Sequence, residues 1–269
     1  MNKKLYYIKK IISDPFSSIA WIWQKSSKYI SDELYLKIYY FLKMKELLNL
    51  KKPRNYQQKL QFLKLNNINP KYTRMADKYL VREIIEEEVG GKYLIPLLGV
   101  WFSFEEIEFD KLPNSFVLKT THDSGTIVIV RDKDSFIKSI EFNKAKKKIS
   151  NALNKNYFYA GREFQYKNIK PRIVAEKYMQ DEKLNDLIDY KFFCFEGKPK
   201  FIFVASDRFK GGVTKFDFYD LNFNKLPFSS KGHPQNDCLA PPTNLNEMIT
   251  LASKLSKDIP HVRVDFYNI

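Results

Sequence analysis

The stretch SFVLKTTHDSGTIVIV, residues 115–130, decides the fold that this sequence predicts. Two β-rich runs, SFVLK and TIVIV, flank the turn-forming segment TTHDSG, so we expect a β-hairpin. The small residues of the turn would let backbone N–H groups approach anionic oxygens, and Lys119 stands just before the turn as a cation. The segment has the parts of a phosphate-binding hairpin, although the sequence contains neither a Walker loop nor a GxGxxG pattern.

Three later segments each read as an apolar strand that carries charged residues: IVAEKYM (173–179), DYKFFCFEGK (189–198) and VRVDFYNI (262–269). Because the side chains of a strand alternate with period two, Asp189 and Lys191 are expected on one face, and Arg263 and Asp265 likewise share a face. Taken singly, the motifs also have plainer interpretations. They are compatible with an ordinary hairpin, an edge strand with an exposed Glu-Lys pair, and an ion pair of Asp189 with Lys191.

Other elements are expected around these strands. Helices are expected from Ser31 and Asp32 onward, over 76–91 and over 141–156. The runs 192–195 and 201–204 straddle a turn, so a second hairpin is expected, at an edge of the same antiparallel sheet. Asn244 and Glu247 resemble a capping box at the start of the last helix.

In order and spacing, the strand segments resemble the ATP-grasp enzymes, and most closely the TupA-like ATP-grasp family found among bacterial surface-polysaccharide genes. The resemblance covers residues Ser31 to Ile269. It implies an α+β fold, with ATP between a small subdomain and an antiparallel sheet subdomain. The expected parts are a basic helical N-terminal region at 1–55, a small α/β subdomain at 56–113 and the ATP-grasp nucleotide-binding region at 114–269.

The resemblance also implies roles for single residues. Lys119, Ser124 and Gly125 match the strand and loop that cover the ATP phosphates. Glu176 matches the glutamate that ends a buried strand beside the adenine. The residues that would line the base are Lys177, Tyr178 and Met179.

For the later strands the resemblance implies a metal site and a catalytic role. Asp265 matches the first metal ligand of an R-x-D motif and would hold Mg²⁺ together with the nucleotide phosphates. Arg263 would stabilise charge at the transferring phosphoryl group. Asp189 would reach the ribose and Lys191 a phosphate. Two further candidates for holding an anionic substrate are Arg172 and Arg208.

The reaction implied by the resemblance is carboxylate–amine ligation, in which a carboxylate takes the γ-phosphoryl group of ATP, becomes an acyl phosphate and is captured by an amine. The expected substrate is the carboxylate of an anionic glycan, such as a uronic acid, or of an amino acid. In the family, a paired strand with a second glutamate follows the R-x-D strand, whereas this sequence ends four residues after Asp265. We therefore expect a C-terminally truncated form that binds ATP weakly and turns over slowly or not at all.

Two other functions are compatible with the sequence. Asp132-Lys133-Asp134 is a D-x-D pattern, which in glycosyltransferases holds the metal of a nucleotide-sugar, but the pattern is short and directly follows a strand, so a charged surface turn is the favoured explanation. The second alternative is a non-catalytic nucleotide-binding protein that has kept the fold. Binding of ATP or of a UDP-sugar would distinguish the ligase from the glycosyltransferase, and a hydrolysis or ligation assay would distinguish an enzyme from a non-catalytic binder.

Composition limits the class of protein and its partners. The chain has 269 residues, of which 44% are hydrophobic and 16% aromatic, so it can bury a large core in one or two domains. The net charge is +15, which would suit RNA, an anionic membrane surface or an acidic glycan. Nucleic acid is not expected, because no nucleic-acid-binding module is present and the aromatic residues alternate with apolar ones.

The N-terminal region has two competing interpretations. Residues 1–60 hold 13 Lys or Arg against 4 Asp or Glu. Beside Trp21 and Trp23, these charges predict peripheral contact with an anionic membrane surface, on the inner face of the membrane. The alternative is a helical layer packed on the main domain.

A cytoplasmic location is expected. There is no signal peptide of the usual form and no run of about 18 apolar residues. Cys194 and Cys238 are far apart, so neither a disulfide framework nor a zinc ribbon is expected. The three histidines are too dispersed to predict a zinc site: His122, His233 and His261.

Overall fold

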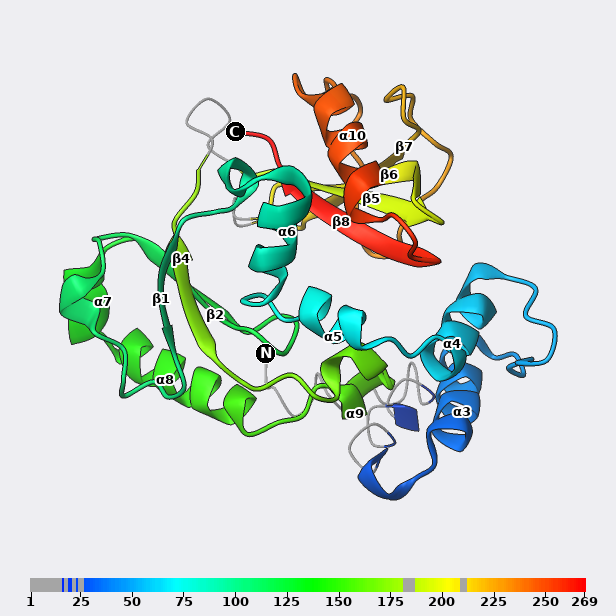
Figure 1. The fold of residues 1–269 in the computed structure, drawn as a ribbon, viewed down its shortest axis with the longest axis horizontal. Coiled ribbons are helices and arrows are strands. Elements are labelled where there is room, and N and C mark those ends of the chain that lie inside the picture. The colour runs from blue at the N-terminus through cyan, green and yellow to red at the C-terminus, as the bar shows by residue number, and fades with distance from the viewer. Residues whose placement is uncertain (1–15, 17–18, 21–22, 24–26, 181–186, 209–211) are drawn as a thin grey trace. The chain divides into compact units, whose positions relative to one another are not determined.

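The computed structural model describes residues 16, 19–20, 23, 27–180, 187–208 and 212–269 (Figure 1). The chain divides into two compact units, and each is described by itself. The first unit comprises Met1–Val81 and Leu97–Lys177, and the second comprises Arg82–Pro96 and Tyr178–Ile269. The divisions expected after residues 55 and 113 remain predictions.

A four-stranded antiparallel sheet forms the centre of the first unit. Its strands are β1 (Leu97–Trp101), β2 (Phe116–Thr120), β3 (Ile127–Val130) and β4 (Ile173–Lys177), in the order β1-β4-β2-β3 (Figure 1). The hairpin expected over 115–130 is confirmed, since β2 and β3 pair from Phe116 opposite Val130 to Lys119 opposite Ile127. β2 also pairs with β4 along its whole length.

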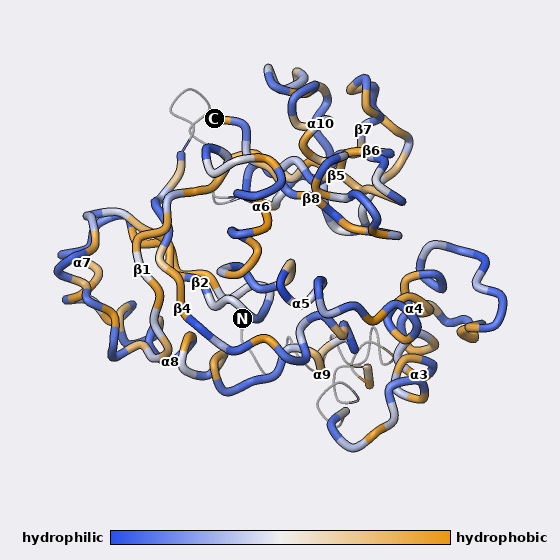
Figure 2. The backbone as a smooth tube through the Cα atoms, in the orientation of Figure 1, coloured by the Kyte–Doolittle hydropathy of each residue, from blue (hydrophilic) through white to orange (hydrophobic). Residues whose placement is uncertain are grey.

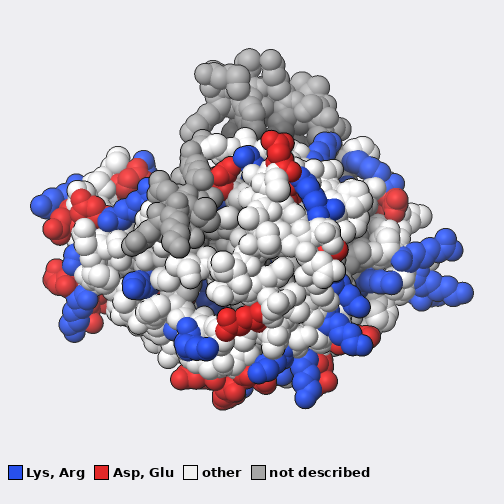
Figure 3. All heavy atoms as spheres, turned by 90° about the horizontal axis from the view of Figure 1, so that it is seen from above, with Lys and Arg blue, Asp and Glu red and all other residues white. Residues whose placement is uncertain are grey.

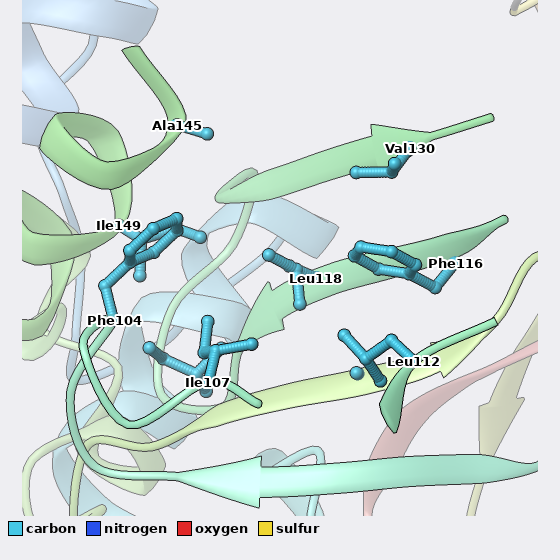
Figure 4. Packing of buried hydrophobic residues seen from close by; sticks show 10 residues of the cluster. Phe104, Ile107, Leu112, Phe116, Leu118, Val130, Ala145 and Ile149 are labelled. Atoms are coloured by element: carbon cyan, nitrogen blue, oxygen red, sulfur yellow. The ribbon is translucent and has the colours of Figure 1, made fainter. Parts of the chain in front are cut away.

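The core of the first unit lies on one face of this sheet. Phe116 and Leu118 of β2 point to that face, where Ala145 and Ile149 of the helix α8 (Ile140–Leu153) pack against the strands (Figure 4). Since side chains alternate along β2, Lys119 points to the opposite face. The elements that surround this core are η3 (Phe109–Lys111) and α7 (Lys133–Lys138). Hydrophobic residues recur along the strands of both units (Figure 2).

The first unit also contains further helices in the described residues. They include η1 (Ser27–Tyr29), α3 (Asp32–Met44), α4 (Tyr56–Asn66) and α5 (Pro70–Ala76) before the sheet, and α9 (Phe158–Gly161) and η4 (Phe164–Tyr166) between α8 and β4. Arg162, the residue that follows α9, connects that helix to α3 and to Ile30, which precedes α3. Its Nε lies 2.7 Å from Asp32 Oδ1, its Nη2 donates to the Ile30 carbonyl at 3.0 Å, and its guanidinium covers the ring of Tyr35.

These contacts bear on the two interpretations of the N-terminal region. Tyr35, Leu36 and Tyr40 of α3 are buried, so α3 forms the packed helical layer. Trp23 stacks on Tyr35 in the same cluster, whereas Trp21 lies outside the described residues. No helix within the described ranges is long and apolar enough to cross a bilayer.

A second four-stranded antiparallel sheet belongs to the second unit. Its order is β7-β6-β5-β8, with β5 (Asp189–Phe195), β6 (Lys198–Ser206), β7 (Lys215–Tyr219) and β8 (His261–Tyr267). The hairpin expected near 192–204 is confirmed as β5 and β6, joined by Glu196 and Gly197 with φ of 49° and 75°. Its expected place at an edge of the first sheet is wrong. β8 pairs along all of β5 and β7 pairs with β6, so the hairpin occupies the centre of a separate sheet.

The two faces of the second sheet differ. One face packs on α10 (Leu245–Leu255) through Met248 and Ala252, with Phe192 and Ile202 among the strand residues that they meet. The capping box expected there is wrong. Asn244 makes no side-chain cap, and Glu247 instead accepts a hydrogen bond from Tyr93 Oη at 2.6 Å. Tyr93 lies in η2 (Gly91–Tyr93), which follows α6 (Val81–Val89).

The other face of the second sheet carries half-buried aromatic rings, which we name the aromatic face. Phe193 stacks on Phe201 at a centroid distance of 4.5 Å, and Phe195 stacks on His261 at the same distance. Phe203 stacks on Phe218 at 5.1 Å. The sheet therefore has a sealed core on one side and a ring-covered surface on the other.

Charged side chains of both signs are interspersed on the protein surface that Figure 3 draws. Lysine and arginine side chains project at several places, often with aspartate or glutamate beside them. In that view, the excess of positive charge is therefore not gathered into a single basic patch.

Candidate functional site

The first sheet brings Lys119 and Glu176 together on the face away from the core. Glu176 of β4 stands opposite Val117 of β2, two residues before Lys119, so the two side chains are diagonal neighbours. Lys119 Nζ donates to Glu176 Oε2 at 2.5 Å, and the two side chains are only 19% and 10% exposed. The attraction between the two opposite charges offsets part of the cost of removing each from water.

The loop after Lys119 is closed by an aspartate. Asp123 accepts hydrogen bonds from the hydroxyls of Thr120 and Thr126, the residues at either end of the loop. Ser124 and Gly125 are exposed at its tip, where Gly125 has a φ of 94°. Among the described residues, no acceptor takes the backbone N–H of Ser124 or Gly125. The loop thus has two exposed residues whose N–H groups are available to an anion.

Lys78 is a functional candidate that the sequence did not reveal. Its Nζ donates to the carbonyl of Thr120 at 2.8 Å and to that of Asp123, so it binds two backbone carbonyls of the loop. Burial lowers the pKa of the Lys78 ammonium, the nearby Asp123 carboxylate opposes that shift, and the positive charge of Lys119 adds to it. We name Lys78, Lys119, Asp123 and Glu176 the loop cluster.

Position 78 follows the end of α5, in a segment that the apolar pattern assigned to one continuous helix over 76–91. Asp77 interrupts that helix by accepting from the N–H of Tyr79 at 2.9 Å, and it also pairs with Arg172 Nη1 at 3.3 Å. Arg172, expected as an anion ligand, is thus engaged by a fully buried carboxylate. A lysine directly after an aspartate that separates two helices would have been the signal, but nothing in the sequence links it to a loop more than 40 residues later.

The residues expected to line the base lie at the end of β4. Lys177 is the last residue of that strand, pairs with Phe116 and has an exposed side chain. Tyr178 and Met179 follow it and are half-buried. Their contact with adenine remains a prediction.

On the second sheet, charged residues gather at one end of β5 and β8. Lys191 stands opposite Asp265 in the register, and its Nζ lies 3.1 Å from Asp265 Oδ2 and 3.0 Å from Asp189 Oδ2. Arg263 embraces Asp265 with two hydrogen bonds, at 2.7 Å and 2.8 Å. The expectations that Asp189 and Lys191 share a face and that Arg263 and Asp265 share a face are confirmed. Asp189 and Lys191 also form the ion pair that was the alternative interpretation of this motif.

Arg208 completes this group by pairing with Asp189. We name Asp189, Lys191, Arg208, Arg263 and Asp265 the strand cluster. Asp189 is buried. The pKa of the neighbouring Tyr267 hydroxyl is raised well above its usual range, mainly by burial of Tyr267 and next by the negative charge of Asp189. Asp265 is more open, with its side chain 36% exposed. The strand cluster shares its sheet face with the aromatic face, since Lys191, Phe193 and Phe195 alternate with buried residues of β5.

The strand cluster suits Mg²⁺ only as a partial site. Mg²⁺ takes oxygen ligands and in nucleotide enzymes uses one or two carboxylates together with phosphates and water. Asp265 supplies such a carboxylate, yet its oxygens are held by Arg263 and Lys191. Within the described residues there is no group of three side chains that could hold a metal. Asp265 could therefore hold a Mg²⁺ ion whose other ligands come mostly from the phosphates of a nucleotide and from water.

The D-x-D pattern has a structural role. Asp132 caps the N-terminus of α7 by accepting from Ser135, with Oγ at 2.5 Å from Asp132 Oδ2, and Lys133 Nζ donates to the Leu112 carbonyl at 2.7 Å. The local helix start therefore explains these residues without a metal.

The described surroundings of the histidines and cysteines are simple. Each histidine has a backbone carbonyl as a ring partner: Ala152 for His122, Thr214 for His233 and Cys194 for His261. Cys194 is buried and Cys238 exposed, and both are free thiols.

Comparisons with known proteins place the chain. No curated protein is similar enough in sequence to be matched. A solved structure of D-alanine–D-alanine ligase from Bacillus anthracis, complexed with ATP, is 20% identical, with a TM-score of 0.38. The match covers 71% of this chain and 49% of that one, so this chain spans about half the length of that enzyme. The model of the family described as TupA-like ATPgrasp matches residues 58–269. With the mixed helices and antiparallel sheets described above, the chain belongs to the TupA-like ATP-grasp family, as the sequence predicted.

Proposed function

We propose that this chain binds ATP through the loop cluster and acts as an ATP-grasp ligase-like protein. The observation that carries the proposal is the loop itself, in which Ser124 and Gly125 are exposed, no described acceptor takes their N–H groups, and Lys119 stands at the start. Backbone N–H groups and a nearby ammonium are what a polyphosphate needs. Lys78 adds a second positive charge behind the same loop. Family membership supports the choice of ATP over other polyphosphates.

In this proposal Lys119 changes partner when the nucleotide binds. Without a ligand, its ammonium is neutralised by Glu176. A phosphate oxygen would compete for that ammonium, which leaves the carboxylate of Glu176 able to accept hydrogen bonds from the sugar or base. Replacing Glu176 with Gln should therefore narrow the preference for ATP over GTP.

For catalysis we propose that Asp265 holds Mg²⁺ with the phosphates, and that Arg263 and Lys191 then turn to the negative charge of the transferring group. When bound, Mg²⁺ neutralises phosphate charge. A carboxylate oxygen of the substrate forms the new bond to the γ-phosphorus as the bond to ADP breaks, and an amine then displaces phosphate from the acyl group. The cations need only position and stabilise charge, so the protein supplies no nucleophile.

The proposed substrate is the carboxylate of a sugar acid or an amino acid. The aromatic face lies on the same sheet face as the strand cluster, so apolar rings and cations are offered side by side. Flat apolar rings suit the apolar side of a sugar ring, and the cations suit its carboxylate. A glycan acid therefore fits this face better than a small amino acid does.

A second candidate is a protein that binds ATP without turnover. The specific observation behind it is the engagement of both Asp265 oxygens by Arg263 and Lys191. A metal would have to displace these contacts before the site could act.

Calorimetry and turnover together test these proposals. Titration with ATP should give heat that saturates at one site, whereas a UDP-sugar should give none. Release of ADP should then rise when glucuronate or galacturonate and an amine are added with Mg²⁺. Binding of the UDP-sugar in place of ATP would overturn the proposed function, and ATP binding without ADP release would leave the non-catalytic candidate.

A further inference from the structure

The outward face of α3 is apolar although its inward face is already buried in the first unit. Leu34, Phe41 and Met44 have exposed fractions of 50%, 40% and 41%. Together with Lys37 they recur at spacings of three and four, so they lie on one side of the helix. Leu47, just beyond the helix, is 82% exposed.

Neighbouring residues enlarge this surface. Phe16 meets Phe41 edge-on at a centroid distance of 6.4 Å and is 38% exposed, and Ile19 is 51% exposed. Lys45 places its ammonium 3.1 Å from the centre of the Phe16 ring. We name the whole surface the α3 patch; its members are Phe16, Ile19, Leu34, Phe41, Met44 and Leu47. Large apolar side chains gathered in this way are more than the scattered single residues of an ordinary surface.

The charges around the patch are mostly basic. Exposed lysines lie in or beside the patch at positions 37 and 45, Lys28 precedes α3, and Lys43 is exposed on the other side of the helix. Glu33 and Lys37 pair at 2.6 Å, so these two charges offset each other, and Asp32 is held by Arg162. Glu46 is exposed as well, but the lysines outnumber it. A partner for this surface would therefore be negatively charged as well as apolar.

We propose that the α3 patch rests on an anionic lipid surface. Leucine, phenylalanine and methionine would enter the boundary between headgroups and acyl chains, and the lysines would contact anionic headgroups. The residues that make this contact differ from those that the sequence indicated, because Trp23 is stacked on Tyr35 inside the protein. The ATP proposal is independent of this surface, which contains none of its residues.

Sedimentation of the full chain with vesicles tests the proposal. The protein should sediment with vesicles of phosphatidylcholine and phosphatidylglycerol at low salt, far less with phosphatidylcholine alone, and less as salt rises. The double variant Phe41→Ser/Leu47→Ser should partition at least about tenfold more weakly, because each apolar side chain removed from the interface lowers binding. A control is Ile140→Ser, which removes an isoleucine of α8 whose exposed fraction, 69%, lies between those of Phe41 and Leu47. It should leave partitioning unchanged.

Three outcomes would overturn the proposal. The first is equal sedimentation with neutral and anionic vesicles. The second is unchanged partitioning of the double variant, whose unaltered circular dichroism and ATP affinity would show that it is folded. The third is a dimer, seen by light scattering in the absence of lipid, that the double variant abolishes while vesicle binding stays absent. That result would assign the α3 patch to a second copy of the chain.

Discussion

The loop cluster of the first unit and the strand cluster of the second unit hold their lysines in different ways. Lys78 donates to two backbone carbonyls of one loop, so the course of the chain fixes its position. Lys191 lies among carboxylates of two strands, which are side chains that can rotate away. The loop cluster is therefore built before a ligand arrives, whereas the strand cluster can exchange a protein cation for another cation.

This difference assigns separate tasks to the two clusters in the proposed function. A rigid anion-binding loop lowers the entropy lost when phosphate binds, so it should govern affinity. An exchangeable set of cations around Asp265 should govern the response to Mg²⁺. Changes in one cluster should thus affect a different measurement from changes in the other.

The largest effect is expected from Lys119→Met. It removes a charge-assisted contact to phosphate at a strand end, so ATP affinity should fall about 10- to 100-fold. Calorimetric titration with ATP measures it. Lys144→Met is the matched control, because Lys144 is an exposed lysine of α8 paired with Glu141, and its affinity should equal that of the parent. Full affinity in a folded Lys119→Met variant would remove the loop cluster from the phosphate site.

The next effect concerns stability and the pair Lys119–Glu176. Glu176→Gln leaves a largely buried ammonium without its counter-charge, so the free energy of unfolding should fall by about 1–3 kcal/mol. In the double variant Lys119→Met/Glu176→Gln no charge is left unpaired, and part of that loss should return. Urea unfolding of the two single variants and the double variant gives the coupling. Strictly additive losses would contradict the interpretation of a mutually neutralising pair.

Asp265→Asn is expected to change the free energy of unfolding less than Glu176→Gln does, and to affect only the response of ATP binding to Mg²⁺. Exposed ion pairs contribute little, so the free energy of unfolding should change by less than about 1 kcal/mol. The gain in ATP affinity caused by Mg²⁺ should disappear, while affinity without Mg²⁺ stays the same. Asp134→Asn, an exposed carboxylate of α7, is the control. A Mg²⁺ response that survives in Asp265→Asn would show that the metal binds elsewhere.

The smallest effect is a pH dependence at the strand β8. Burial lowers the pKa of His261 below its ordinary value of 6.5, the hydrogen bond to the Cys194 carbonyl opposes this, and the charge of Arg263 adds to it. As pH falls below 6.5, the unfolded chain takes up a proton that the folded protein does not, so stability decreases until the folded pKa is reached. Thermal unfolding between pH 7 and pH 5 should show a shallower loss in His261→Asn. Parallel curves for the two proteins would contradict this.

The two clusters also differ in how far the sequence predicted them. Asp189, Lys191, Arg263 and Asp265 follow from the period of two, because a strand fixes the face of each side chain. Lys78 does not, because its role depends on a break at Asp77 and on a contact with a loop far along the chain.

The fold was predictable to a similar extent. The local patterns of both hairpins were readable, since turn residues and alternation lie within a few residues of each other. The division into two sheets was not, since alternation does not specify which strands pair. The cap expected at Asn244 failed for a related reason, as Glu247 is engaged by Tyr93, more than 150 residues away.

The fastening of α3 by Arg162 has a consequence for synthesis. The Ile30 carbonyl and Arg162 are 132 residues apart, so at about 5–20 residues per second the helix emerges from the ribosome roughly ten seconds before its partner is made. During that interval Tyr35 lacks the Ala160 carbonyl to which its hydroxyl donates and the Arg162 guanidinium that covers its ring, whereas Trp23 and Leu48 of the same cluster are close to it in sequence. Until Arg162 is made, α3 can pack only on its neighbours in sequence, so its burial is completed late in synthesis.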